Sequence, residues 1–146
     1  MEKNEIITND LMENDNFIMD LTEKRVVSFS SLNPKTDKEK KEFFNLVNST
    51  EKRVGDMINE TINVKDVYVE IVNCVEKETG EVTQCPRTVL IDDKGVGYQA
   101  VSIGVFSGLK KVFQIFGLPQ TWEKPLPLKV KQITKGERKI LTFEVK

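Results

Sequence analysis

The stretch 98–117, YQAVSIGVFSGLKKVFQIFG, constrains the fold most, because a short strand pattern passes directly into an apolar helix pattern. Ser102 is a suitable N-cap, and Gly117 followed by Pro119 ends the helix. Large apolar side chains recur at steps of three and four residues, as on the buried face of a helix: Val105, Phe106, Leu109, Val112, Phe113 and Phe116. A stripe this wide covers one face of a sheet or the open end of a small barrel.

Strand patterns lie on both sides of this helix. Thr36 and Glu39 form a capping box, which predicts a second helix ending near Asn48, and a helical turn or irregular chain is expected around Gly55. Alternating or β-branched segments predict strands at 25–31, 64–76, 82–91, 96–101, 128–133 and 139–145. Pro86 predicts a bulge or an unpaired edge, and the proline-rich stretch 118–127 predicts a loop without regular pairing.

From residue 64 the order is three strands, a helix and two strands. It predicts a mainly β fold with helices (α+β), specifically an OB-fold-like five-stranded barrel with a capping helix and an N-terminal strand-helix extension. An alternative makes segment 25–31 the first barrel strand, with the helix that follows as an insertion. We expect an acidic, partly mobile arm over residues 1–23 and a single domain over 24–146, with its core at 64–146.

Charge is divided unevenly along the chain. Residues 1–86 carry 11 basic and 18 acidic side chains, whereas residues 87–146 carry 11 basic and 5 acidic ones. The C-terminal part is therefore the candidate for binding an anionic partner, although lysines that protect exposed strand edges would give the same count. Apolar runs are too short for a membrane span and the acidic N-terminus is unlike a targeting signal, so we expect a cytoplasmic protein.

Single-stranded nucleic acid is the anionic partner that fits the side chains best. Its binding requires cations for the phosphates and exposed aromatic rings for the bases. Lys129 and Lys131 share one strand face, about 7 Å apart, and face solvent together. Tyr98 and Trp122 also have structural interpretations, as a core ring and as an anchor of the proline-rich loop. The candidate site residues are Tyr68, Arg87, Lys94, Tyr98, Trp122, Lys129, Lys131, Lys135, Arg138 and Lys139.

Catalysis has little support in the sequence. Histidine is absent, which removes the commonest general base and metal ligand. The metalloprotease, phosphate-loop, serine-hydrolase and paired-cysteine motifs are also absent, and the pair Asp92 and Asp93 is better explained by turn chemistry. We expect neither enzymatic activity nor a metal or cofactor. Cys74 and Cys85 lie on the two arms of a predicted hairpin, where a cross-strand bridge is geometrically conceivable, but in a reducing cytoplasm we expect free thiols.

Two runs carry a resemblance to a known family: TVLIDDKGVGYQAVSIGVFSGLKKVFQIFG and PLPLKVKQITKGERKILTFEV. They resemble the C-terminal part of the single-stranded DNA-binding proteins of tailed bacteriophages, over roughly residues 64–146. The resemblance implies an OB-fold protein without enzymatic activity that coats single strands during phage genome replication in the bacterial host. Tyr98, Lys129, Lys131 and the turn at Lys135 and Gly136 are the positions that match its pattern. Its implied partners are single-stranded DNA and phage replication proteins.

A second interpretation is a protein-binding module that docks on a host or viral enzyme through the helix at 103–116 or through the N-terminal arm. Such a module would have no salt-sensitive affinity for DNA. The sequence leaves the oligomeric state open.

Overall fold

The computed structural model describes residues 28–146, so the expectations for the arm at 1–23 and for the strand start at 25–27 lie outside the described residues. No helix in the described part is long and apolar enough to cross a membrane. The elements are β1 (Ser28–Ser30), α2 (Asp37–Asn48), β2 (Lys52–Arg53), the 3₁₀ helix η2 (Val54–Met57), β3 (Thr61–Val75), β4 (Val82–Asp92), β5 (Gly97–Val101), α3 (Ile103–Phe116), the 3₁₀ helix η3 (Pro119–Thr121), β6 (Leu126–Lys135) and β7 (Arg138–Val145).

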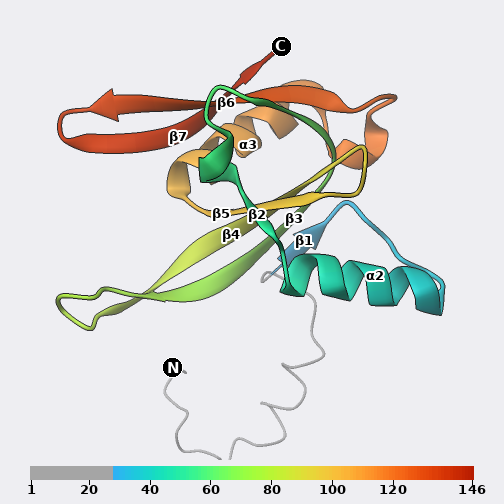
Figure 1. Cartoon of the computed structure of the whole chain (residues 1–146), viewed down its shortest axis with the longest axis horizontal. Coiled ribbons are helices and arrows are strands. Elements are labelled where there is room, and N and C mark those ends of the chain that lie inside the picture. Colours follow the sequence, from blue (N-terminus) through green and yellow to red (C-terminus); the bar gives the residue numbers. More distant parts are fainter. Residues whose placement is uncertain (1–27) are drawn as a thin grey trace, which may run out of the picture.

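The strands form one curled sheet, a half-barrel, in the order β2-β5-β4-β3-β6-β7, with β1 beside β3 (Figure 1). The predicted succession of three strands, a helix and two strands is confirmed by β3, β4, β5, α3, β6 and β7. β3 is the longest strand, and its start pairs with β6 while its middle pairs with β1. Segment 28–30 therefore lies beside the predicted first strand of the barrel and does not replace it.

The main core lies between the sheet and α3. Ser102 caps the helix by accepting a hydrogen bond from the Val105 backbone N–H at 3.2 Å, and Gly117 ends it with φ 85°. Val105, Leu109 and Val112 are buried against side chains of β3, β4 and β6. The predicted stripe is thus confirmed at its centre, but its last member, Phe116, is 44% exposed.

Helix α2 lies on the other face of the sheet from α3 (Figure 1). Its capping box is confirmed: Thr36 Oγ1 accepts from the Glu39 backbone N–H, and the Glu39 carboxylate accepts from the backbone N–H of Lys35 and Thr36. These bonds lower the pKa of Glu39. A side chain at Gly97 would touch Leu46 of α2, so this helix covers the outer face of β4 and β5.

Because both faces are covered, β4 has an unbroken buried run at 88–91 in place of an alternating pattern.

Of the two alternatives predicted for Pro86, a bulge or an unpaired edge, the structure shows the unpaired edge. Pro86 pairs with Ile71 without a shift in register, and the irregularity in the β3–β4 ladder lies between Val64 and Asp66. Pro86 is tolerated because β5 begins to pair with β4 only at Arg87, which leaves the edge of β4 unpaired at the proline. β6 starts at Leu126, and Pro127 lies opposite Asn63 within the ladder, so the predicted irregular loop is shorter than 118–127.

The expectation of free thiols is wrong for this structure. Cys74 on β3 and Cys85 on β4 are joined as a disulfide, and their Cα atoms are 6.4 Å apart. The antiparallel ladder places Cys85 opposite Val72 and Cys74 opposite Thr83, so the bridge is diagonal. The expectation rested on a reducing cytoplasm. The hairpin geometry nevertheless brings the two cysteines within the Cα–Cα range that a disulfide spans.

Candidate nucleic-acid interface

The β6–β7 hairpin has one apolar and one basic face. Leu128 and Val130 point into the core, so the alternate residues Lys129 and Lys131 point outward, as predicted. The register places Lys135 opposite Arg138 on this outward face, in line with Lys129 and Lys131. Lys131 Nζ lies 3.7 Å from Glu144 Oε1, but both side chains are exposed, and such a pair is weak.

A groove of about 560 Å³ lies between α3 and the outer end of this hairpin. Lys111 lines it from α3, and Lys135 and Arg138 line it from the hairpin. None of the described residues that line it is acidic. Its other walls include the apolar side chains Ile103, Ile115, Phe116, Ile133 and Ile140. The groove therefore combines apolar walls with positive charge.

Two glycines bring α3 close to β7. A Cβ atom at Gly104 would clash with the Leu141 carbonyl oxygen and the Ile140 side chain, and one at Gly108 would lie 3.3 Å from the Phe143 ring. In an isolated helix each glycine is unfavourable by about 1 kcal/mol relative to alanine. Here the missing side chain permits the close approach of helix and strand that forms the groove.

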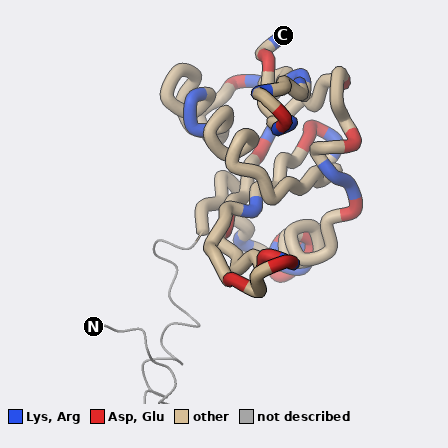
Figure 2. Tube along the Cα trace, turned by 90° about the vertical axis from the view of Figure 1, so that its left-hand side faces the viewer, with Lys and Arg blue, Asp and Glu red and all other residues tan. Residues whose placement is uncertain are grey.

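The hairpins β3–β4 and β6–β7 extend toward the same side of the molecule (Figure 1). Their tips differ in charge, since the first carries Glu76, Lys77, Glu78 and Glu81, and the second carries Lys135, Glu137, Arg138 and Lys139. Figure 2 views this side, and red segments mark the loop at its lower end. Phosphates are therefore favoured near β6–β7 and disfavoured near the tip of β3–β4.

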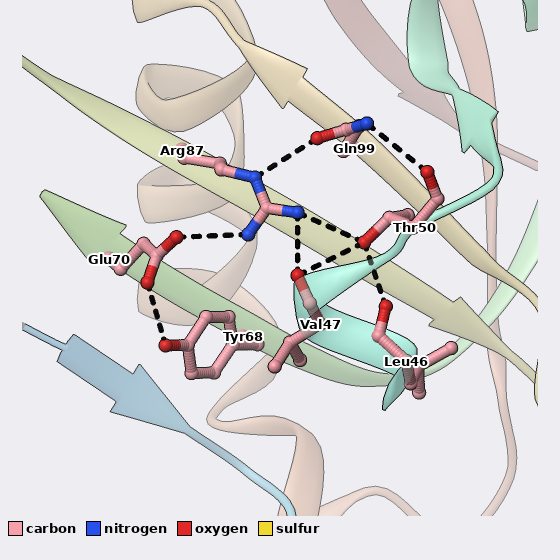
Figure 3. Close-up of polar contacts among 7 residues, drawn as sticks. All are labelled: Leu46, Val47, Thr50, Tyr68, Glu70, Arg87 and Gln99. Atoms are coloured by element: carbon pink, nitrogen blue, oxygen red, sulfur yellow. Dashed lines mark hydrogen bonds and ion pairs between the residues drawn. The ribbon is translucent and has the colours of Figure 1, made fainter. Parts of the chain in front are cut away.

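Arg87 belongs to an internal network that holds α2 on the sheet (Figure 3). Its guanidinium donates to Gln99 Oε1 at 3.0 Å, to the Val47 carbonyl at 2.7 Å and to Thr50 Oγ1 at 3.0 Å. It also pairs with Glu70 at 3.0 Å, with only 13% of its side chain exposed. Each guanidinium nitrogen of Arg87 thus already has a partner, and Arg87 lies on the face of the sheet that α2 covers, away from the groove beside α3.

Both tyrosines are also engaged within the fold. The Tyr68 hydroxyl donates to Glu70 Oε1 at 2.9 Å, and its ring meets the ring of Phe43 edge-on with centroids 5.6 Å apart. Burial, reinforced by Glu70, raises the pKa of Tyr68 to about 12. Tyr98 is 8% exposed and donates to Asp92 at 3.2 Å, and burial followed by the Asp92 charge raises its pKa. Neither ring lines the groove.

Trp122 lies at the end of α3. Its indole Nε1–H lies 3.1 Å from the carbonyl oxygens of Phe116 and Gly117 and can donate to either, and its ring packs against the core.

The last two predicted residues lie apart from the groove. Lys94 is exposed in the β4–β5 turn beside Asp92 and Asp93, and Lys139 pairs with Thr134 on the face of the hairpin opposite to Lys135. The structure thus brings Lys129, Lys131, Lys135 and Arg138 to one face and places the other six predicted residues elsewhere.

Lys111 and Phe116 line the groove but were not predicted as site residues. The sequence signal for Lys111 was the polar pair at 110–111 within an apolar helix. Phe116 was assigned to the core because it continues the buried periodicity.

A family of phage single-stranded DNA-binding proteins matches the chain over residues 22–146. Neither the curated proteins nor the solved structures include a match to the chain. The family match covers the whole described part, including the basic hairpin, α3 and the groove between them. The chain therefore belongs to the phage single-stranded DNA-binding proteins, and it binds single-stranded DNA in phage replication.

Proposed function

We propose that this protein coats single-stranded DNA without sequence preference and that the strand follows the outward face of β6 into the groove beside α3. The observation that carries this proposal is the set of three basic and no acidic lining residues in the groove, among those described. Lys129 and Lys131 extend the same positive face along β6. Phosphates bound by such side chains release counterions, so affinity falls steeply as salt rises.

The outer face of β4 and β5 is the less favourable path. OB folds bind oligonucleotides on the corresponding face of their second and third strands. Here α2 covers that face, and the guanidinium of Arg87 on it is already bonded to Val47, Thr50 and Glu70. We accordingly place the DNA of this protein on the fourth and fifth strands of the barrel and on α3.

The finer features of the fold belong to the same proposal. The order β5-β4-β3-β6-β7, with α3 between its third and fourth strands along the chain, supports a five-stranded OB-type barrel. We propose a single domain over residues 24–146, built on the core at 64–146 and preceded by the acidic arm at 1–23. β1 and α2 form the part of the extension that is described.

The proposed activity is binding alone, because neutralising and coating a strand requires no chemical step. The site of action is the cytoplasm of the bacterial host. Phage replication proteins are the second proposed class of partner, and the exposed apolar side chains of Ile71, Val75 and Val82 on the β3–β4 ribbon support a protein contact there.

A triple substitution of Lys111, Lys135 and Arg138 to alanine tests the proposed path. We expect markedly weaker binding to oligo-dT and a salt dependence about two units shallower, since each phosphate contact on a single strand contributes roughly 0.7 to the slope. The matched control replaces Lys38, Lys40 and Lys41 of α2 by alanine. These side chains are exposed, and their replacement removes the same charge. Equal losses in both triple variants would show that only net charge matters and would contradict the path.

A further inference from the structure

The groove beside α3 differs in charge from three other cavities of the described chain. A cavity beneath α2 is lined by one basic and six acidic residues, and one beside Trp122 by two basic and three acidic residues. The apolar groove between β1 and α3 has one residue of each sign. Only the groove beside α3, among these four, is net positive and therefore suited to a polyanion.

Phe116 supplies an aromatic ring to this groove. It is the last residue of α3 and remains 44% exposed, although the helix buries Val112 one turn earlier. Ile115, its neighbour on α3, is 75% exposed and lines the same groove. An exposed apolar wall with Lys111 one turn away and Lys135 and Arg138 farther along the groove offers contacts for both parts of a nucleotide strand, its bases and its phosphates.

The backbone that carries the Phe116 ring is held in place. The Gly117 backbone N–H donates to the Phe113 carbonyl at 2.9 Å, which closes the last turn of the helix. The Trp122 indole N–H lies within hydrogen-bonding distance of the Phe116 and Gly117 carbonyl oxygens. A ring presented on a fixed backbone loses less conformational freedom when a base stacks on it.

We propose that Phe116 is a base-stacking residue, on which one nucleobase of the single strand lies while Lys111 binds a nearby phosphate and Lys135 and Arg138 bind phosphates farther along the groove. This inference rests on the proposed function and adds to it the recognition of the base. Trp122 then acts as a positioning residue, because it anchors the end of α3 and lines a different cavity.

The test compares Phe116→Ala with Phe44→Ala as the matched control. Phe44 is also exposed, at 61%, but it lies on α2 and lines none of the four cavities. The probes are oligo-dT and an abasic oligonucleotide of the same length, which keeps the phosphates and lacks the bases. Since one stacked base is worth about 1–3 kcal/mol, Phe116→Ala should weaken oligo-dT binding roughly 5- to 150-fold.

Binding of the abasic probe should stay unchanged in Phe116→Ala, Phe44→Ala should bind both probes as the original chain does, and Phe116→Trp should retain oligo-dT affinity. Equal weakening of both probes by Phe116→Ala would indicate a structural role and overturn the inference, as would unchanged oligo-dT affinity. A failure of the proposed function looks different, because the original chain itself would then bind neither probe.

Discussion

Tyr68 and Tyr98 are the only tyrosines, and each donates its hydroxyl hydrogen to a carboxylate while its ring is largely covered. Burial raises the pKa of both, to about 12 for Tyr68. A raised pKa means that the fold favours the neutral phenol. The resulting stabilisation is complete below the ordinary pKa of about 10 and is lost as the pH rises through the folded value.

We therefore predict that ultraviolet titration of the native protein shows no phenolate formation near pH 10. The same protein in denaturant should ionise both tyrosines there, which provides the control. A native transition at pH 10 involving one tyrosine would show that this ring is open to solvent, and it would restore that ring as a candidate for contact with bases.

Gly104 gives the second prediction at the scale of the residue. Alanine there meets the backbone of β7, so Gly104→Ala should destabilise the fold by roughly 1–3 kcal/mol and weaken DNA binding by displacing α3 from the groove. Urea unfolding and oligo-dT titration measure the two effects. The control is Gly55→Ala, where the nearest atom to the new Cβ is 3.9 Å away and no loss is expected. Similar stabilities for the two variants would contradict the close packing of α3 on β7.

At the scale of the element, the network around Arg87 joins α2 to the sheet, while none of the side chains of α2 is fully buried. Replacing Arg87 by lysine keeps the charge but loses the planar fork that reaches Glu70, Thr50 and the Val47 carbonyl together. We predict a loss of roughly 2 kcal/mol in the free energy of unfolding, with unchanged affinity for DNA. Arg53→Lys, on the exposed strand β2, is the control and should alter neither quantity.

A reduced affinity of Arg87→Lys in a variant that remains folded would show that Arg87 contacts DNA, as the sequence suggested, and that α2 leaves its face of the sheet.

The elements follow from local signals that act over a few residues. The capping box at Thr36, the N-cap at Ser102 and the positive φ of Gly80, Gly95, Gly117 and Gly136 fix where helices and turns begin or end. Alternation along β3 and β6 likewise predicted which side chains face the core. Such features depend on sequence neighbours, which is why the order from β3 to β7 was predictable.

The site was less predictable, because it depends on which elements meet. Arg87 and Tyr98 have the residue types of a DNA-binding surface, but α2 and the core engage them in contacts between residues far apart in sequence. Phe116 is exposed because the last turn of α3 extends beyond the part of the helix that packs against the sheet. Helical periodicity in the sequence does not show where that packing ends. The paired lysines of β6, by contrast, follow from strand alternation alone.

At the scale of the whole molecule, the half-barrel has two different faces. One is closed by α2 and lined by acidic residues beneath it, and the other presents the basic hairpin and the groove beside α3. The acidic tip of the β3–β4 ribbon lies on the same side as the basic hairpin and limits where the phosphates can run. A bound strand should therefore contact one edge of the molecule.

Hydrogen exchange of the full chain with and without oligo-dT shows which of the two faces binds the strand. We predict that DNA slows amide exchange in the C-terminal half of α3 and along β6 and β7, while exchange in α2 stays the same. Slowed or accelerated exchange in α2 and at the facing residues of β4 and β5, with no change beside α3, would contradict it and would place the DNA on the face that α2 covers.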